Sequence, residues 1–510
     1  MKKLAAILLL LAALLGGVAI YQHRSAPRAD APTLTVYCAA GLKKPVEAVA
    51  QQYEREAGVE VRLQFGGSGT LLSQLRVAKQ GDLFIVADDG SLADARKADV
   101  IREVVPLAKQ KPVIAVRTGN PKNIQTVADL LRAEVKVALA NPEAASISRV
   151  SRAVLGETWT KLAAHAAVMK PTVTEIAADL ALGTVDAAIV WDSTVAQFKG
   201  TQAVEVPELA ARSENASAAV LGFCSQPAAA LRFARYLSAP EKGGAIFKAS
   251  GFTPAGGDKW ADQPELVLYS GGVNRPAVEG LLKKFADREG VTVTTIFNGC
   301  GILCASMKTM GDASNPKFPD AYFACDLCFV PPVAHMFPEA VILTETDIGI
   351  VVRKGNPRGV KTLADLAQPE LKVGLCNAEQ STLGYMTRGI LKSSALDASV
   401  RKNVVVETPT ADLLVTQMRA GALDAAILYR VNFNPSAEHL DYIAIQHEGA
   451  KAMQPFSVRA TSPNYRLGLR LLDYLKANRE SFVQAGFSWR GEEPALQSKD
   501  IVVPEWLKDK

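Results

Sequence analysis

The sequence predicts an α/β protein made of two copies of one domain, and two observations lead to this prediction. Short runs rich in β-branched residues alternate with helix-length segments, as sheets covered by helices on both faces require. The second half of the chain also repeats the first half in the same order. Because 510 residues exceed one ordinary core, two domains of roughly 230 residues are expected.

The repeat is ungapped over its first stretch. LTVYCAAGLKKPVEAVAQQYEREAGVEVRLQFGGSGTLLSQL, from Leu34, aligns with LVLYSGGVNRPAVEGLLKKFADREGVTVTTIFNGCGILCASM, from Leu266, at a constant shift of 232 positions (266 − 34). RTGNP, TVADL and VDAAIVW then match RKGNP, TLADL and LDAAILY. We therefore expect a first copy over residues 33–258, a cysteine-rich second copy over residues 263–510, and a junction near residues 254–265.

Within the first copy, the pattern predicts the elements in chain order. β-Branched runs indicate strands at residues 34–37, 59–65, 83–86, 113–117, 135–139 and 187–191. A helix is expected over about residues 45–57. Strands separated by helices imply parallel sheets, and ligands bind such sheets beyond the carboxyl ends of the strands, at helix N-termini. The turns between strands and helices are therefore the candidate binding segments.

Small residues fill four of these turns. They are CAAG after the first strand, GGSGT after the second, NPEAAS ending at Ser146, and PTVT ending at Thr174. Helix N-termini carry unpaired amides and a partial positive charge, so several that converge can bind an anion without arginine or lysine. Glycine and serine also cap helices and form turns without any ligand. Four such turns in one duplicated fold favour binding over capping alone.

Composition and charge argue against several functional classes. With 48% hydrophobic and 21% charged residues, the chain has the makeup of a globular protein. The formal charge of +5, without long runs of lysine or arginine, argues against nucleic acid as a partner. No nucleophile is paired with a base, and no nucleotide-binding loop or metalloprotease motif is present in the sequence. We therefore expect no enzyme activity.

The N-terminal segment is typical of an export signal. Lys2 and Lys3 precede an apolar run from Leu4 to Ile20. The run is at the short edge of a membrane span, so cleavage and retention as an anchor both remain open. We expect residues 1–32 to be a signal peptide or membrane anchor followed by a tether, and the protein to be exported.

The order VYCAAG, FGGSGTLLSQL, GDLFIVAD, NPE and VDAAIVW resembles the periplasmic molybdate-binding proteins of ABC importers. The resemblance covers about residues 34–252 and, more weakly, residues 266–487. It implies a type II periplasmic-binding-protein fold in each copy, with two hinged lobes that close on a tetrahedral oxyanion such as molybdate or tungstate. It also implies a periplasmic location and an inner-membrane ABC permease as the partner.

In that family, backbone amides and hydroxyls of these turns hold the ligand, together with an aromatic hydroxyl on a late strand. Carried over to the first copy, the binding positions are Ala40, Gly41, Gly67, Ser68, Gly69, Ser146, Val173 and Trp191. In the second copy they are Gly272, Val273, Gly299, Cys300, Gly301, Thr382, Ala411 and Tyr429. Two departures stand out, since the family's usual serine is replaced by Gly41 and Val273, and its tyrosine by Trp191.

The second copy holds five of the seven cysteines, namely Cys300, Cys304, Cys325, Cys328 and Cys376. Three interpretations stay open: disulfides in an exported protein, unpaired buried cysteines, and a metal bound by the first four thiols. Cys300 stands where the first copy has Ser68, at a helix N-terminus that favours thiolate and would repel an oxyanion. The alternative function is therefore a membrane-tethered metal or redox protein. No other cofactor is expected.

Overall fold

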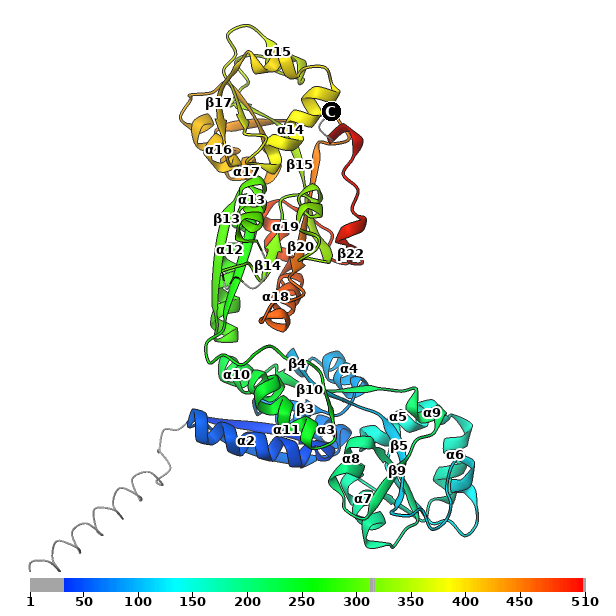
Figure 1. Cartoon of the computed structure of the whole chain (residues 1–510). Helices are drawn as coiled ribbons and strands as arrows, with labels where there is room; N and C mark the ends of the chain where they lie inside the picture. Colours follow the sequence, from blue (N-terminus) through cyan, green and yellow to red (C-terminus); the bar gives the residue numbers. More distant parts are fainter. Residues whose placement is uncertain (1–31, 312–314, 316, 508–510) are drawn as a thin grey trace, which may run out of the picture. The chain divides into compact units, whose positions relative to one another are not determined.

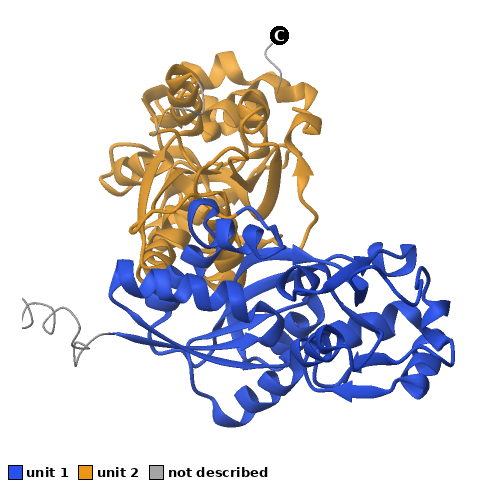
Figure 2. Cartoon of the chain, turned by 60° about the horizontal axis from the view of Figure 1, so that its bottom comes forward, with its two compact units in different colours: residues 1–256 blue, residues 257–510 orange. Residues whose placement is uncertain are grey.

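The computed structural model describes residues 32–311, 315 and 317–507 (Figure 1). The chain forms two compact units, residues 1–256 and 257–510 (Figure 2), and the division falls within the junction expected near residues 254–265. The expected signal or anchor over residues 1–32 lies outside the described residues, apart from Pro32. In the described part of the chain, no helix is long and apolar enough to cross a bilayer.

The first lobe of unit 1 is built on a six-stranded sheet with the order β11-β4-β10-β3-β1-β2. Its strands are β1 (Thr33–Ala39), β2 (Glu60–Gly66), β3 (Leu83–Val86), β4 (Ile101–Gln110), β10 (Glu214–Leu221) and β11 (Thr253–Pro254). Its helices are α2 (Lys43–Ala57), α3 (Ser68–Ala78), α4 (Asp89–Lys97), α10 (Pro227–Ser238) and α11 (Ala245–Ala249). Helix α2 buries Val46, Val49 and Tyr53 on one face and ends at Gly58, which adopts a left-handed conformation.

The second lobe of unit 1 contains a five-stranded sheet with the order β7-β6-β8-β5-β9. Its strands are β5 (Pro112–Arg117), β6 (Val137–Ala140), β7 (Val168–Lys170), β8 (Ala187–Trp191) and β9 (Thr201–Val204). Its helices are α5 (Ser146–Leu155), α6 (Glu157–His165), α7 (Val173–Leu182), α8 (Asp192–Gln197) and α9 (Pro207–Ala210). Every residue of β6 and β8 is buried, which explains their uninterrupted apolar sequences.

The sheets are mixed, which corrects the expectation of parallel sheets. Strand β10 runs antiparallel to β3 and β4, and β5 runs antiparallel to β8 and β9. The chain enters β5 and β10 directly from the other lobe. These two strands therefore run in the opposite direction to their neighbours. One crossing lies at Lys111, whose amide donates to Asp192 Oδ1 at 3.1 Å, while the Asp192 amide donates to the Lys111 carbonyl at 2.9 Å.

Unit 2 repeats this plan, but one strand runs through both of its lobes. Strand β15 (Glu339–Arg353) pairs with β20 in the first lobe and with β18 and β19 in the second, which joins both lobes into an 11-stranded sheet. The other strands are β12 (Glu265–Gly271), β13 (Thr292–Asn298), β14 (Ala321–Phe323), β16 (Val373–Cys376), β17 (Val404–Thr408), β18 (Ala425–Tyr429), β19 (Leu440–Ala444), β20 (Lys451–Val458), β21 (Ser488–Trp489) and β22 (Leu496–Gln497). The helices are α12 (Arg275–Glu289), α13 (Cys300–Met310), α14 (Thr382–Ser393), α15 (Asp397–Arg401), α16 (Ala411–Arg419), α17 (Arg430–Phe433), α18 (Tyr465–Ala477) and α19 (Arg479–Ala485).

Two further features stabilise unit 2. Arg470 and Glu289 form a buried, two-pronged ion pair, with Nε–Oε1 and Nη2–Oε2 distances of 2.7 and 3.1 Å. After β22, the segment 498–507, here called the C-terminal strap, joins the two lobes. Its Ser498 amide donates to the Pro338 carbonyl at 2.8 Å in the first lobe, and Tyr385 of α14 donates its hydroxyl to the Leu507 carbonyl at 2.6 Å in the second.

Candidate functional site

A pocket lies between the two lobes of unit 1. It is a small pocket that is partly open to solvent. It is lined by Ala39, Ala40, Gly41, Gly66, Gly67, Ser68 and Ala87 from the first lobe, and by Ala145, Ser146, Ile147, Thr172, Val173 and Trp191 from the second. The lining therefore includes every position expected in the first copy except Gly69, and it contains no charged side chain.

Two helices begin at this pocket without a side-chain cap. Helix α3 starts at Ser68 after Gly67, and α5 starts at Ser146 after Ala145; neither preceding residue offers a side-chain acceptor. The partial positive charge of both N-termini is therefore directed at the pocket.

The Ser68 hydroxyl is the most informative polar group in the pocket. Its side chain is only 1% exposed, and no described residue forms a hydrogen bond with its Oγ. Leaving a buried hydroxyl unsatisfied costs about 1–3 kcal/mol, and this one lies in the pocket lining at the N-terminus of α3. The hydroxyl and the two helix N-termini together offer hydrogen-bond donors without any positive side chain, which suits an anion.

Gly67 and Gly69 lie where the two lobes touch. A Cβ atom on Gly67 would overlap the Ala144 carbonyl oxygen, and one on Gly69 would overlap the Glu143 carbonyl oxygen. The Gly69 amide donates to the Ala144 carbonyl at 3.0 Å, so it serves the contact between the lobes in this structure. These glycines therefore allow the close approach of the lobes beside the pocket.

An ionic contact also joins the lobes of unit 1. Arg149 of α5 binds Asp94 at 2.7 Å, the Ser91 hydroxyl at 2.6 Å and the buried carboxylate of Asp88, all from the first lobe. Asp88 directly follows Ala87 of the pocket lining. Arg149 and Asp88 are about sixty positions apart and belong to no recognisable motif, so no sequence signal marks this contact.

In unit 2, the binding positions predicted for the second copy lie in the first turns of helices or, for Tyr429, at the end of a strand. Gly272 and Val273 lie in the short helix η4 (Gly272–Asn274), Cys300 begins α13, Thr382 begins α14, Ala411 begins α16, and Tyr429 ends β18. A Cβ atom on Gly299 or Gly301 would overlap the backbone of the facing lobe, as in unit 1. The hydroxyls of Thr382 and Tyr429 are both buried, and that of Tyr429 has no hydrogen-bond partner among the described residues. We call this set of positions the unit 2 cradle: Gly272, Val273, Gly299, Cys300, Gly301, Thr382, Ala411 and Tyr429.

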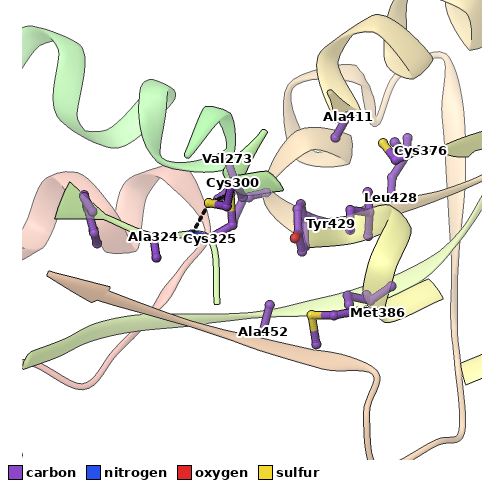
Figure 3. Packing of buried hydrophobic residues seen from close by; sticks show 14 of the residues in the cluster. Val273, Cys300, Ala324, Cys325, Cys376, Met386, Ala411, Leu428, Tyr429 and Ala452 are labelled. Atoms are coloured by element: carbon purple, nitrogen blue, oxygen red, sulfur yellow. Dashed lines mark hydrogen bonds between the residues drawn. The ribbon is translucent and has the colours of Figure 1, made fainter. Parts of the chain in front are cut away.

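Two thiols meet in the unit 2 cradle (Figure 3). The Sγ atoms of Cys300 and Cys325 lie 3.1 Å apart, and the Cys325 amide donates to Cys300 Sγ at 3.1 Å. Burial opposes ionisation of Cys300, but hydrogen bonds from Cys325 and Tyr322 outweigh it and lower the pKa of the Cys300 thiol to about 7. The same hydrogen bond and burial raise the pKa of Cys325. Thr382 lies close enough to lower both pKa values, though it does not reverse the shift at Cys325.

The four thiols expected to hold a metal are not assembled as one ligand set. Cys304 Sγ lies 3.6 Å from the Tyr322 hydroxyl and 3.6 Å from the Phe329 carbonyl, and burial raises its pKa to about 12. Burial also raises the pKa of Cys328. No group of three or more His, Cys, Asp or Glu side chains within the described ranges is arranged to hold a metal. None of the seven cysteines, all of them described, forms a disulfide, so the disulfide interpretation is wrong for this structure.

Duplicated two-lobed α/β units, with a cradle of amides and hydroxyls between the lobes, define a solute-binding protein. The chain belongs to the family described as bacterial extracellular solute-binding protein, which matches residues 34–253 and again residues 266–488. Both the resemblance inferred from the sequence and the tandem type II fold are thereby confirmed. The family is one of solute-binding proteins rather than enzymes.

Molybdate-binding proteins are among the relatives. The molybdate-binding protein ModA of Mycobacterium bovis is 30% identical over 230 residues, covering 44% of this chain and 86% of that protein. A binding protein of Haemophilus influenzae is 25% identical over 228 residues, covering 44% of this chain and 93% of its own. Among solved structures, the periplasmic molybdate-binding protein of Azotobacter vinelandii matches with a TM-score of 0.37 and 19% identity, over 43% of this chain and 98% of that one.

Proposed function

We propose that unit 1 captures a tetrahedral oxyanion of the molybdate or tungstate type outside the inner membrane and delivers it to an ABC permease. The observation that carries this proposal is the Ser68 hydroxyl, which is buried in a pocket between two lobes and lacks a partner. The relationship to ModA of Mycobacterium bovis supports molybdate as the first anion to test. Closure of the lobes around the crossing segments is the proposed capture step.

The chemistry of the lining suits a fully deprotonated oxyanion. Amides and hydroxyls donate hydrogen bonds, and each bond to a charged partner contributes about 1.5–3 kcal/mol. No carboxylate lines the pocket, so nothing there repels the anion. The anion must shed its water to enter, and the pocket's size would then discriminate molybdate and tungstate from the smaller sulfate.

Titration calorimetry of the purified protein with molybdate, tungstate, sulfate and phosphate tests this proposal. We expect submicromolar binding of molybdate or tungstate, and Ser68→Ala should weaken it roughly 10- to 150-fold, which corresponds to one hydrogen bond to a charged group. Ser73→Ala, an exposed change on the same helix, should leave the affinity unchanged. Absence of heat with all four anions would reject oxyanion capture, and unchanged affinity in Ser68→Ala would remove Ser68 from the site.

A further inference from the structure

Three matched exchanges distinguish the unit 2 cradle from the unit 1 pocket. Cys300 replaces Ser68 at the start of the helix, at the constant shift of the repeat. The strand register gives the second exchange. Val36 pairs with Leu83 in unit 1, and the matching Leu268 pairs with Ala321 in unit 2. Four residues further along, Cys325 therefore replaces Ala87.

In the third exchange, Gly271 of unit 2 replaces Ala39 of unit 1, which makes room for the two thiols. A Cβ atom on Gly271 would overlap Cys325 Sγ and lie 3.3 Å from Cys300 Sγ. The backbone of Gly271 has φ −58° and ψ 138°, which any residue adopts, so glycine is required here for space alone. One methyl group is lost where two sulfur atoms enter. The thiol pair is therefore fitted to its surroundings.

The hydroxyls of the cradle point to a ligand that also carries oxygen. Thr382 is 0% and Tyr429 2% exposed. The Tyr429 hydroxyl has no hydrogen-bond partner among the described residues, and the Thr382 hydroxyl lies beside both thiols. Tyr429 lies near Cys300 and Cys325 (Figure 3), since burial and then the charges of these thiols raise the pKa of its hydroxyl. Apolar side chains at these positions would be enough for packing. Two buried hydroxyls beside two thiols suit a ligand with a thiophilic centre and attached oxygens.

The spacing of the sulfur atoms limits the shape of that centre. With a sulfur-to-metal distance of about 2.3 Å, a linear arrangement would separate the two sulfurs by roughly 4.6 Å. The observed separation is 3.1 Å. The pair therefore fits a bent arrangement, as in a pyramidal trivalent centre, rather than the linear one of a two-coordinate copper(I) ion.

We propose that unit 2 binds a trivalent, thiophilic oxo-acid of the arsenite or antimonite class through Cys300 and Cys325. In the binding step two arsenic–sulfur bonds form and two arsenic–oxygen bonds break. The two thiol protons leave with the two hydroxyl groups as water. The oxidation state of arsenic does not change, so no oxidant or reductant is consumed. The remaining oxygen on arsenic hydrogen-bonds to Thr382 and Tyr429.

The test uses the whole protein, reduced and then freed of reductant without air, with sodium arsenite as the probe. After gel filtration, elemental analysis should find one arsenic per chain. Cys300→Ser and Cys325→Ser should each lose it, whereas Cys304→Ser, which alters a buried thiol on the same helix, should retain it. Tyr429→Phe should weaken retention about tenfold, the effect of one hydrogen bond.

A second measurement needs no variant and so does not depend on folding of the mutants. Arsenite should protect the wild-type peptides that contain Cys300 and Cys325 from alkylation, and a competing dithiol should remove the protection. Absence of arsenic in the reduced protein, its retention by Cys300→Ser, or selective uptake of copper(I) instead would each overturn the proposal. Molybdate binding by unit 1 is measured separately, so either hypothesis can fail alone.

Discussion

Replacing Gly271 by alanine should destabilise unit 2, and replacing Cys325 by alanine in the same chain should restore the lost stability. The added methyl group would overlap Cys325 Sγ and lie 3.0 Å from the Cys325 amide nitrogen, so the sulfur or strand β12 must move in a close-packed core. Overpacking of this kind costs about 1–3 kcal/mol. Because the backbone at Gly271 suits alanine, no conformational strain adds to that figure.

The double variant reproduces the pair Ala39 and Ala87 of unit 1. Cys325→Ala alone removes one buried atom and should cost about 1 kcal/mol, as small core truncations do. If the methyl group fills the space left by the sulfur, the double variant should lie within about 1 kcal/mol of the wild type. The two changes would then be coupled by about 1–3 kcal/mol, as expected for residues in contact.

Hydrogen exchange resolved by peptide is the suitable assay, because a chain of two units has no single free energy of unfolding. Peptides from β12 and β14 report on unit 2, and peptides from unit 1 serve as an internal reference. Gly280→Ala is the control, since its Cβ would meet nothing within 4 Å on helix α12 and should be neutral or slightly stabilising. Wild-type protection in Gly271→Ala, or a double variant no better protected than Gly271→Ala, would refute the reasoning.

Three further predictions concern lobe contacts and buried charge. Gly69→Ala should keep the lobes of unit 1 apart and weaken molybdate binding at least tenfold in calorimetry. The control Thr70→Ala changes an exposed residue and should not weaken binding. Equal affinities of the two variants would contradict a role of Gly69 in closure. Arg470→Met should destabilise unit 2 by about 3–5 kcal/mol in hydrogen exchange, because it removes the two hydrogen bonds that the guanidinium donates to the buried Glu289 carboxylate. Adding Glu289→Leu should recover most of the loss. Tyr385→Phe removes one hydrogen bond to the C-terminal strap and should lower the stability of unit 2 by about 1 kcal/mol. Faster hydrogen exchange should be confined to α14 and the strap. Uniformly faster exchange across unit 2 would argue against a local role.

The local plan of the fold could be predicted from the sequence because its signals are local. The buried runs at residues 83–86 and 187–191 are strands in the structure, and the expected helix ends at Ala57, where Gly58 adopts a left-handed conformation. Strand direction could not be predicted from such runs, since an apolar segment reads the same in parallel and antiparallel pairs. The antiparallel β5 and β10 follow from the passage of the chain between lobes.

The sequence by itself determined the duplication, the α/β class, the family and the turns that form the cradle. Only the tertiary structure decided how those turns are used. It set the Gly69 amide against the facing lobe, joined Arg149 to Asp88, and brought Cys300 within 3.1 Å of Cys325 while Cys304 turned to Tyr322. The physical reason is that spacing along the chain fixes contacts only within an element. Contacts between elements depend on how the sheets pack, and here the loss of one methyl group at Gly271 made the space for two sulfur atoms.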